Sequence, residues 1–292
     1  MADRQPGGPT LVCVGNLTID EAIHGGVRSA PAMGGDAAYA ALAARLYLQD
    51  VRMLAPVGSD LPRWVLDSLH NAGVQADNLP QRDIPTVRNE ILYHADGGRT
   101  WNMISTEEEF DTLSVYPDDV APALLDADGF MLSAMSLRSQ LTLTPWLRTN
   151  SGAALYLDVQ EDYLDGNRDL LYAMIAVSDV FMPSEIEAVT LAGTNDLDQA
   201  ARTFQRLGPR TVVIKRAERG SLVIDGDAMV EVPTERAVAI DSTGAGDAFC
   251  GAFAAAHLIS GDAVVAARAG SRAARIAISA FGIDGLIGAF TP

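Results

Sequence analysis

Short apolar runs alternate with longer helical segments along most of the chain. The first run, residues 10–15, is continuously apolar, as expected of a strand that is buried on both faces. The Ala-rich segment 36–48 has helical character, and a second strand at 51–55 and a helix at 64–72 follow. Further strand-like runs come later, at 129–133, 154–158, 180–182, 211–215 and 221–224. The pattern predicts a doubly wound α/β fold with a mostly parallel sheet flanked by helices, and a site at the carboxyl ends of its strands.

Residues 86–105 follow a different pattern. Their polarity alternates roughly every second residue, and the turn-forming triplet Asp96-Gly97-Gly98 divides them. This predicts an antiparallel hairpin. We expect the hairpin to pair with the non-helical segment 16–32, so that segments 16–34 and 84–106 form a small β-sheet lid on a single domain covering residues 1–292. Lids of this kind close over substrates and exclude water.

The charge, the cysteines and the apolar runs of the chain exclude several classes of partner and site. The net charge of −17 argues against a nucleic-acid-binding surface, which needs clustered Lys and Arg. Cys13 and Cys250 both lie in apolar runs, without the number or spacing of a disulfide framework or a metal site. The polar residues 1–9 contain no signal-peptide core, and no apolar run reaches the roughly 18 residues of a membrane span. These features predict a cytoplasmic protein without membrane contact.

The most informative segment combines two glycines with a carboxylate at the start of a helix. Gly244-Ala245-Gly246 precedes the strongly helical run 247–256. Small residues let backbone N–H groups converge at a helix N-terminus, which favours anion binding. Asp247 would lie beside the anion and could remove a proton from an attacking hydroxyl group. Taken alone, the same residues also fit a tight turn in which Asp247 only complements the helix dipole.

The wider string Asp241-Ser-Thr-Gly-Ala-Gly-Asp-Ala-Phe249, followed by Gly251, resembles the C-terminal signature of the ribokinase-like (PfkB) carbohydrate kinases. Other motifs extend the resemblance over most of the chain. They are Asp20 after the first strand, the pair Gly34-Gly35, the lid, the element Pro183-Ser-Glu-Ile-Glu187, and the strand 212–217 with residues 218–220.

The resemblance implies an ATP-dependent kinase with Mg²⁺, and a monovalent cation such as K⁺ is a further candidate. It implies that Asp247 is the catalytic base, with Gly244, Ala245 and Gly246 as the anion hole. Glu187 would organise Mg²⁺ through water. The remaining implied positions are Lys215, Ala217, Gly220 and Thr243 for the nucleotide, and Asp20, Gly34, Gly35, Asp36 and Tyr39 for the acceptor.

Three residues depart from the family pattern. Ser184 replaces the usual Asn before Glu187, Ala217 replaces a Gly, and Tyr39 stands where many members have Asn. Tyr39 would reshape the acceptor pocket, or pack under the lid as a helix residue. Asp158 ends a strand, where it could face the site or only the solvent.

The expected reaction is ATP-dependent phosphorylation of a hydroxymethyl group on a sugar or sugar derivative. A nucleoside kinase is the alternative, with Tyr39 or Trp101 as an aromatic wall for the base. A sugar-binding protein without catalysis is a third reading, favoured only by Ser184 and Ala217. Paired lids make a homodimer reasonable.

Overall fold

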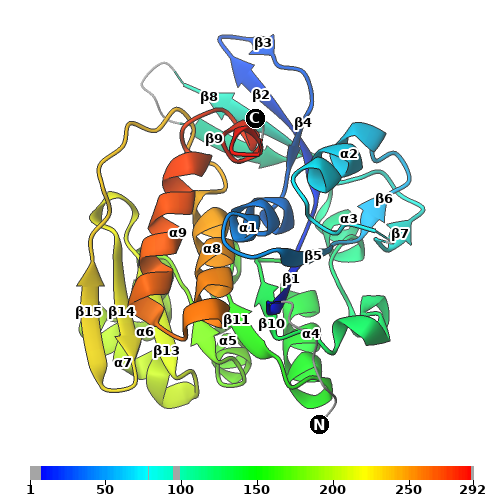
Figure 1. Cartoon of the computed structure of the whole chain (residues 1–292). Coiled ribbons are helices and arrows are strands. Elements are labelled where there is room, and N and C mark those ends of the chain that lie inside the picture. The colour runs from blue at the N-terminus through cyan, green and yellow to red at the C-terminus, as the bar shows by residue number, and fades with distance from the viewer. Residues whose placement is uncertain (1–7, 78, 95–98, 291–292) are drawn as a thin grey trace.

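The computed structural model describes residues 8–77, 79–94 and 99–290, without the side chains of Arg99 and Trp101. An eight-stranded sheet runs through the molecule (Figure 1). Its strand order is β15 (Ala228–Val232), β14 (Ser221–Asp225), β13 (Thr211–Lys215), β12 (Val180–Phe181), β11 (Ala154–Leu157), β10 (Gly129–Leu132), β1 (Thr10–Val14) and β5 (Asp50–Leu54). All neighbours from β13 to β5 are parallel, whereas β14 and β15 are antiparallel. The predicted mostly parallel sheet is confirmed, and β15 was not predicted.

Each face of the sheet supports its own hydrophobic core. Along β1, Leu11 and Cys13 belong to one core and Val12 and Val14 to the other, as the alternation of side chains in a strand requires. The first core is covered by helices α1 (Asp36–Arg45), α8 (Ala245–Ser260) and α9 (Ala263–Ala277), which lie in front of the sheet in Figure 1. The second core packs against α4 (Leu137–Asn150), α5 (Arg168–Ile175), α6 (Glu185–Ala192) and α7 (Leu197–Leu207).

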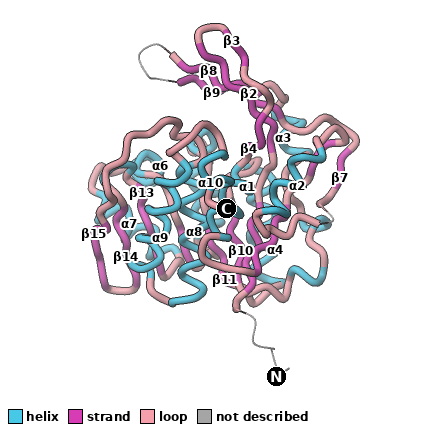
Figure 2. The backbone as a smooth tube through the Cα atoms, turned by 45° about the horizontal axis from the view of Figure 1, so that its top comes forward, coloured by secondary structure: helices cyan, strands magenta, loops and turns pink. Residues whose placement is uncertain are grey.

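The predicted lid is a second sheet, which stands above the body in Figure 2. Strand β2 (Thr18–His24) pairs in parallel with β8 (Arg88–Tyr93), and β8 forms an antiparallel hairpin with β9 (Arg99–Met103). The short strands β3 (Val27–Arg28) and β4 (Ala32–Gly34) flank β2. Both the hairpin and its pairing with the earlier segment are therefore confirmed, while the predicted turn at Asp96-Gly97-Gly98 lies outside the described residues.

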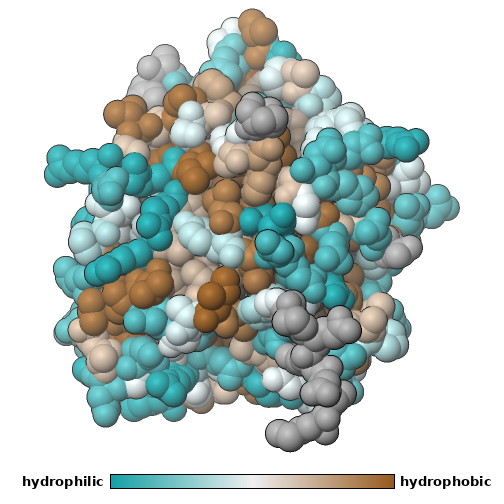
Figure 3. Space-filling view, in the orientation of Figure 1, coloured by the Kyte–Doolittle hydropathy of each residue, from teal (hydrophilic) through white to brown (hydrophobic). Residues whose placement is uncertain are grey.

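The remaining helices and strands are short. They are β6 (Val57–Gly58), α2 (Arg63–Asn71), β7 (Gln81–Arg82), α3 (Glu107–Thr112) and α10 (Asp284–Gly288). In Figure 3 polar side chains cover much of the face seen in Figure 1, and apolar side chains reach the surface near the lid. No helix in the described part of the chain is both long and apolar enough to cross a membrane.

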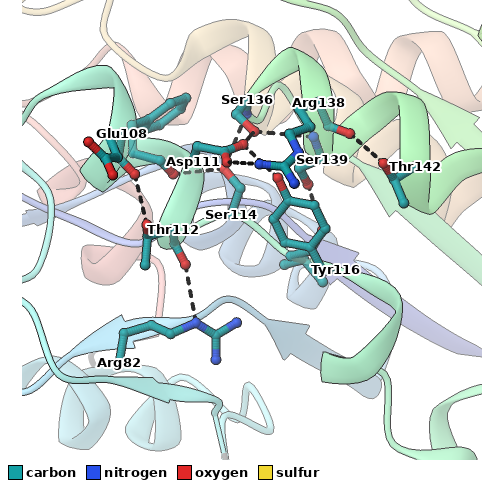
Figure 4. Close-up of polar contacts among 12 residues, drawn as sticks. Arg82, Glu108, Asp111, Thr112, Ser114, Tyr116, Ser136, Arg138, Ser139 and Thr142 are labelled. Atoms are coloured by element: carbon teal, nitrogen blue, oxygen red, sulfur yellow. Dashed lines mark hydrogen bonds and ion pairs between the residues drawn. The ribbon is translucent and has the colours of Figure 1, made fainter.

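A polar cluster fixes the chain where it returns from the lid to the body. Asp111 on α3 accepts hydrogen bonds from the hydroxyl groups of Tyr116, at 2.6 Å, and Ser136. It also forms an ion pair with Arg138, with 3.6 Å between Nη1 and Oδ2 (Figure 4). Ser136 is the N-cap of α4, so α3 is tied to the carboxyl end of β10, beside the predicted site.

Candidate active site

The predicted anion hole lies where α8 begins. Gly244 is the N-cap residue and adopts φ 70°, a left-handed conformation that favours glycine. A Cβ atom at this position would lie 2.2 Å from the ring of Tyr39, so the close approach of α1 also requires glycine here. The first N–H groups of a helix have no acceptors within it, which leaves the first turn of α8 able to bind an anion.

Asp247 is half-buried on this first turn and lies in the wall of a large cavity. Burial and the charge of Asp158 raise the pKa of Asp247 to about 6, while the positive charge of Lys215 acts in the opposite direction. A carboxyl group with a pKa just below neutrality is suited to general-base catalysis near neutral pH.

The large cavity has a volume of about 1510 Å³ and extends from the anion hole along the carboxyl end of the sheet. Seven of the predicted residues contribute to its wall: Glu187, Lys215, Ala217, Gly220, Ala245, Gly246 and Asp247. The extended segment 234–239 and the helix α9 form its outer side. The lining suits a nucleotide whose phosphates end at α8, and the cavity is large enough to hold one.

Ala217 marks an unusual point in this wall. Its φ of 49° makes it the sole non-glycine residue with a left-handed backbone in the described part of the chain. Glycine adopts this conformation without the steric cost that an L-residue incurs, which gives a physical reason for the glycine usual at this position. The departure at Ala217 therefore preserves the turn shape at an energetic cost.

Glu187 has two roles in the geometry. Its Oε2 accepts a 2.6 Å hydrogen bond from the backbone N–H of Ser184, and its own N–H donates to Ser184 Oγ at 3.2 Å, so the pair caps α6. Burial and the charge of Asp158 raise the pKa of Glu187 to about 7, while Lys215 and the bonds from Ser184 oppose this. Such crowding of carboxylates fits a hard cation, because Mg²⁺ prefers oxygen ligands.

Nowhere in the described residues do three or more His, Cys, Asp or Glu side chains form a ready-made metal site. A Mg²⁺ ion that accompanies a nucleotide is usually held mainly by phosphates and water, with one or two carboxylates. Glu187 is the predicted residue whose charge suits that role, whereas Asp158 is paired with Lys215.

A second cavity of about 580 Å³ lies between the lid and the body. Asp20 lines it, and Asp20 Oδ1 accepts hydrogen bonds from Thr18 Oγ1 at 2.7 Å and Asn89 Nδ2 at 2.8 Å. Burial raises the pKa of Asp20, although these two hydrogen bonds oppose the shift. The carboxylate is thereby oriented at the floor of the cavity.

Aromatic side chains from the lid and from the body line this second cavity. The rings of His24 and Tyr93 are stacked, with centroids 4.2 Å apart and an interplanar angle of 7°. Phe281, from the loop before α10, packs edge-on against both, at 5.1 Å from His24 and 5.7 Å from Tyr93. Trp64 on α2 adds another aromatic side chain to the wall.

Comparisons with known proteins agree with this geometry. The model of the pfkB family of carbohydrate kinases matches residues 25–286. The chain is 31% identical over 258 residues to a cytidine kinase of Thermococcus kodakarensis, covering 85% of this chain and 88% of that protein. It is 27% identical over 238 residues to a deoxyribokinase of Salmonella typhi, covering 78% and 76%. The chain belongs to the PfkB family of carbohydrate kinases.

An E. coli structure described as a ribokinase II in complex with ATP and Mg²⁺ superposes with a TM-score of 0.80, at 20% identity and over 97% and 98% of the two chains. At this identity the likeness shows the ribokinase-like fold. As a PfkB-family member the protein is an ATP-dependent kinase of a sugar or nucleoside.

In this PfkB kinase the predicted acceptor residues separate into two groups. Asp20 lines the smaller cavity. Gly34 packs against the Asp20 side chain, since a Cβ on Gly34 would lie 1.9 Å from Asp20 Oδ2. Gly35 adopts φ 96° before α1, and Asp36 Oδ1 accepts a 2.7 Å hydrogen bond from the N–H of Asn16. These two residues shape the backbone below the cavity.

Tyr39 is 2% exposed and lies outside the set of residues that line either cavity. Its ring packs against Gly244, and its hydroxyl group has no hydrogen-bond partner among the described residues. The aromatic wall of the smaller cavity comes instead from His24, Tyr93 and Phe281. The side chain of Trp101, the other residue considered for that wall, lies outside the described part of the chain.

Thr243 holds the loop before the anion hole. Its N–H and hydroxyl groups donate to Asp241 Oδ1 at 3.0 and 2.8 Å, and Asp241 Oδ2 accepts from the N–H of Gly282 at 2.9 Å. Although burial opposes ionisation, these bonds keep the pKa of Asp241 below its usual value. Asp241 also accepts a hydrogen bond from Tyr93 of the lid.

The sequence interpretation missed Tyr93 and Phe281, which line the smaller cavity, and Asn89, which donates a hydrogen bond to Asp20 there. A usable signal was present for two of them. Alternation along β8 places Asn89 and Tyr93 on the same face, and β8 pairs in register with the strand that carries Asp20. No comparable pattern marks Phe281, which comes from a loop distant in sequence.

Proposed function

We propose that this kinase transfers the γ-phosphoryl group of ATP to the hydroxymethyl group of a nucleoside. The observation that carries the proposal is the aromatic wall of His24, Tyr93 and Phe281 in the acceptor cavity, with Asp20 in the same cavity. Flat aromatic surfaces suit a nucleobase, and a carboxylate can accept hydrogen bonds from sugar hydroxyl groups. A volume of about 580 Å³ is within the range of small-ligand sites.

The charges around the acceptor cavity support an unphosphorylated acceptor. Among the residues that the structure describes, its lining contains Asp20, Asp241 and Asp284 but no Lys or Arg. A phosphate group bound there would be repelled, whereas a neutral nucleoside or sugar would not. The cytidine kinase similarity favours a nucleoside, and the deoxyribokinase similarity makes a free pentose the second candidate.

The proposed chemistry assigns each step to a residue. The Asp247 carboxylate takes the proton of the acceptor hydroxyl group while that oxygen bonds to the γ-phosphorus. The bond from the γ-phosphorus to the bridging oxygen breaks at the same centre, and ADP leaves. The N–H groups at the start of α8 stabilise charge on the transferring group. The lid excludes water, which would otherwise compete as the acceptor.

Cations enter the proposal in two ways. Mg²⁺, held through water by Glu187, would neutralise charge on the phosphates. A requirement for a monovalent cation such as K⁺ is a separate expectation, which replacing K⁺ by a bulky organic cation in the assay would test. A cytoplasmic location and a homodimer joined through the lids also belong to the proposal, and light scattering would measure the oligomeric state.

An ADP-release assay with matched acceptors tests the function. Cytidine, adenosine and inosine should support turnover with a higher kcat/KM than ribose or deoxyribose. Sugar phosphates should be poor acceptors. A preference for free pentoses would select the second candidate. Thermal stabilisation by an acceptor, without ADP release from any of them, would show that the protein is a binding protein rather than an enzyme.

A single substitution links the assay to the cavity. Phe281→Ala should raise KM for nucleosides by about tenfold, equivalent to about 1.4 kcal/mol, because the base loses an aromatic contact. The KM for ribose is the internal control and should change little. Equal effects on both acceptors would contradict the placement of the base beside Phe281.

A further inference from the structure

A compact cluster of three side chains lies behind the anion hole. Lys215 Nζ lies 2.5 Å from Asp158 Oδ2 and 3.3 Å from Cys250 Sγ, and Cys250 Sγ lies 3.4 Å from the same Asp158 oxygen. The side chains of Lys215 and Asp158 are 13% and 8% exposed, and Cys250 is fully buried. The carboxylate and the thiol thus hold the ammonium group from two sides.

Lys215 is the one lysine of the sequence; all other members of its 21 lysines and arginines are arginines. Lysine presents a compact ammonium group on a flexible stem, whereas arginine presents a planar fork. Buried ion pairs often contribute little net stability, because desolvation offsets their attraction. The single buried lysine therefore calls for a reason other than stability.

Its position supplies that reason. A Cβ atom placed on Gly246 of the anion hole would lie 3.8 Å from Lys215 Nζ. Burial opposes the charged form of Lys215, but the negative charges of Asp158 and Glu187 raise its pKa above the usual value. The ammonium group therefore stays charged beside the point where α8 receives the phosphate.

Asp247 competes for the same ammonium group. It lies on α8 one turn before Cys250, and its carboxyl group feels the charges of both Asp158 and Lys215. A lysine paired with Asp247 would occupy the base that must receive the acceptor proton. Asp158, at the end of β11, is placed to prevent that pairing by binding Lys215 itself.

We propose that Asp158 is a positioning residue, which holds the Lys215 ammonium group against a γ-phosphoryl oxygen and away from Asp247 during transfer. The inference rests on the phosphoryl transfer proposed above. Lys215 donates a hydrogen bond to the transferring group, while Asp247 takes the proton and the bridging oxygen leaves with ADP. Asp158 touches neither substrate and acts through Lys215.

A double-mutant cycle of Asp158→Asn and Lys215→Met tests the proposal with full-length protein and the best acceptor of the wild type. Asp158→Asn should lower kcat by about 10- to 100-fold, the scale expected for a misplaced catalytic group, with little change in acceptor KM. The double variant should be no slower than Lys215→Met alone, because Asp158 has no role once the ammonium group is gone. Independent, multiplicative losses would overturn the proposal.

Asp179→Asn is the matched control. Asp179 pairs with Arg148 at 2.5 Å, directly before β12 at the opposite end of the sheet. This variant also breaks an ion pair of the sheet, so it should lower the unfolding temperature but keep kcat. If Asp158→Asn and Asp179→Asn have the same kcat at saturating substrates, the proposal is rejected.

A second pair of variants tests the proposal if the Asp158→Asn protein does not fold. Cys250→Ala removes the thiol beside Lys215 without leaving a charge unpaired, and Cys13→Ala removes the other buried cysteine within β1. Cys250→Ala should lower kcat and Cys13→Ala should not. Equal kcat values in these two variants would then reject the proposal. Lack of ADP release from the wild type with every acceptor would instead reject the proposed function.

Discussion

The carboxyl group of Asp247 binds a proton more tightly in the folded chain than in an unfolded one, because burial and Asp158 raise its pKa to about 6. As a base it must be ionised, so kcat/KM for the acceptor should fall as the pH drops through about 6. Asp247→Asn should reduce kcat by about 10²- to 10⁴-fold at pH 7.5. A steady-state pH profile of the wild type and the variant measures both effects.

The same shift has an opposite consequence for stability. Because the pKa of Asp247 is higher in the folded chain than in the unfolded chain, its protonation stabilises the fold at pH values below the unfolded-chain pKa. This stabilisation is lost as the pH rises through the folded-chain pKa. At pH 7.5 Asp247→Asn should therefore melt at a higher temperature than the wild type while being nearly inactive. A melting temperature below that of the wild type would contradict the burial of an ionised Asp247.

Ala217 offers a second prediction at the scale of one residue. An L-residue in the left-handed region destabilises the fold by roughly 1–2 kcal/mol, and a glycine would remove this strain. Glycine also makes the unfolded chain more flexible, which offsets about 0.5–1 kcal/mol of the gain. Ala217→Gly should therefore raise the free energy of unfolding by about 0.5–1 kcal/mol, measured in urea. Ala228→Gly, which lies in a strand, is the control and should be neutral or destabilising.

At the scale of elements, the contact between α1 and α8 sets the position of the anion hole. A Cβ on Gly251 would lie 2.0 Å from the carbonyl oxygen of Ala40, and backbone cannot yield as a side chain can. Gly251→Ala should therefore destabilise the protein by about 1–3 kcal/mol, despite the better helix propensity of alanine, and should also lower kcat.

Gly152→Ala is the control for that prediction, because an added Cβ there meets no atom within 4 Å. Chemical denaturation and ADP release measure both variants. An unchanged kcat in a destabilised Gly251→Ala protein would mean that α8 can shift without disturbing the anion hole.

The elements themselves were largely predictable from local sequence. Continuous apolar runs revealed the central strands, and alternation with a turn triplet revealed the lid hairpin. Strand β15 was missed because it is a short, mostly exposed edge strand in which Glu231 interrupts the apolar residues. The bonds of Asp158 and the contribution of Phe281 to the aromatic wall were not predictable, since they join residues far apart in sequence whose side-chain directions depend on tertiary packing.

At the scale of the whole molecule, the net charge of −17 opposes the approach of ATP. The nucleotide cavity adds no net attraction, because its wall contains more acidic than basic residues. Raising the ionic strength to about 0.15 M should screen this repulsion and lower KM for MgATP, whereas KM for a neutral acceptor should not change. A rise in the ATP KM with salt would show that local cations such as Lys215 dominate the encounter.

The solitary lysine also gives the protein a built-in reporter. A lysine-specific endoprotease has one target bond in this sequence, between Lys215 and Arg216, and would divide the chain into residues 1–215 and 216–292. In the folded protein that bond joins β13 to the turn of the nucleotide site, and both side chains are at most 13% exposed. The rate of this single cut therefore measures how often the site opens locally, and its suppression by nucleotide would report occupancy without any label.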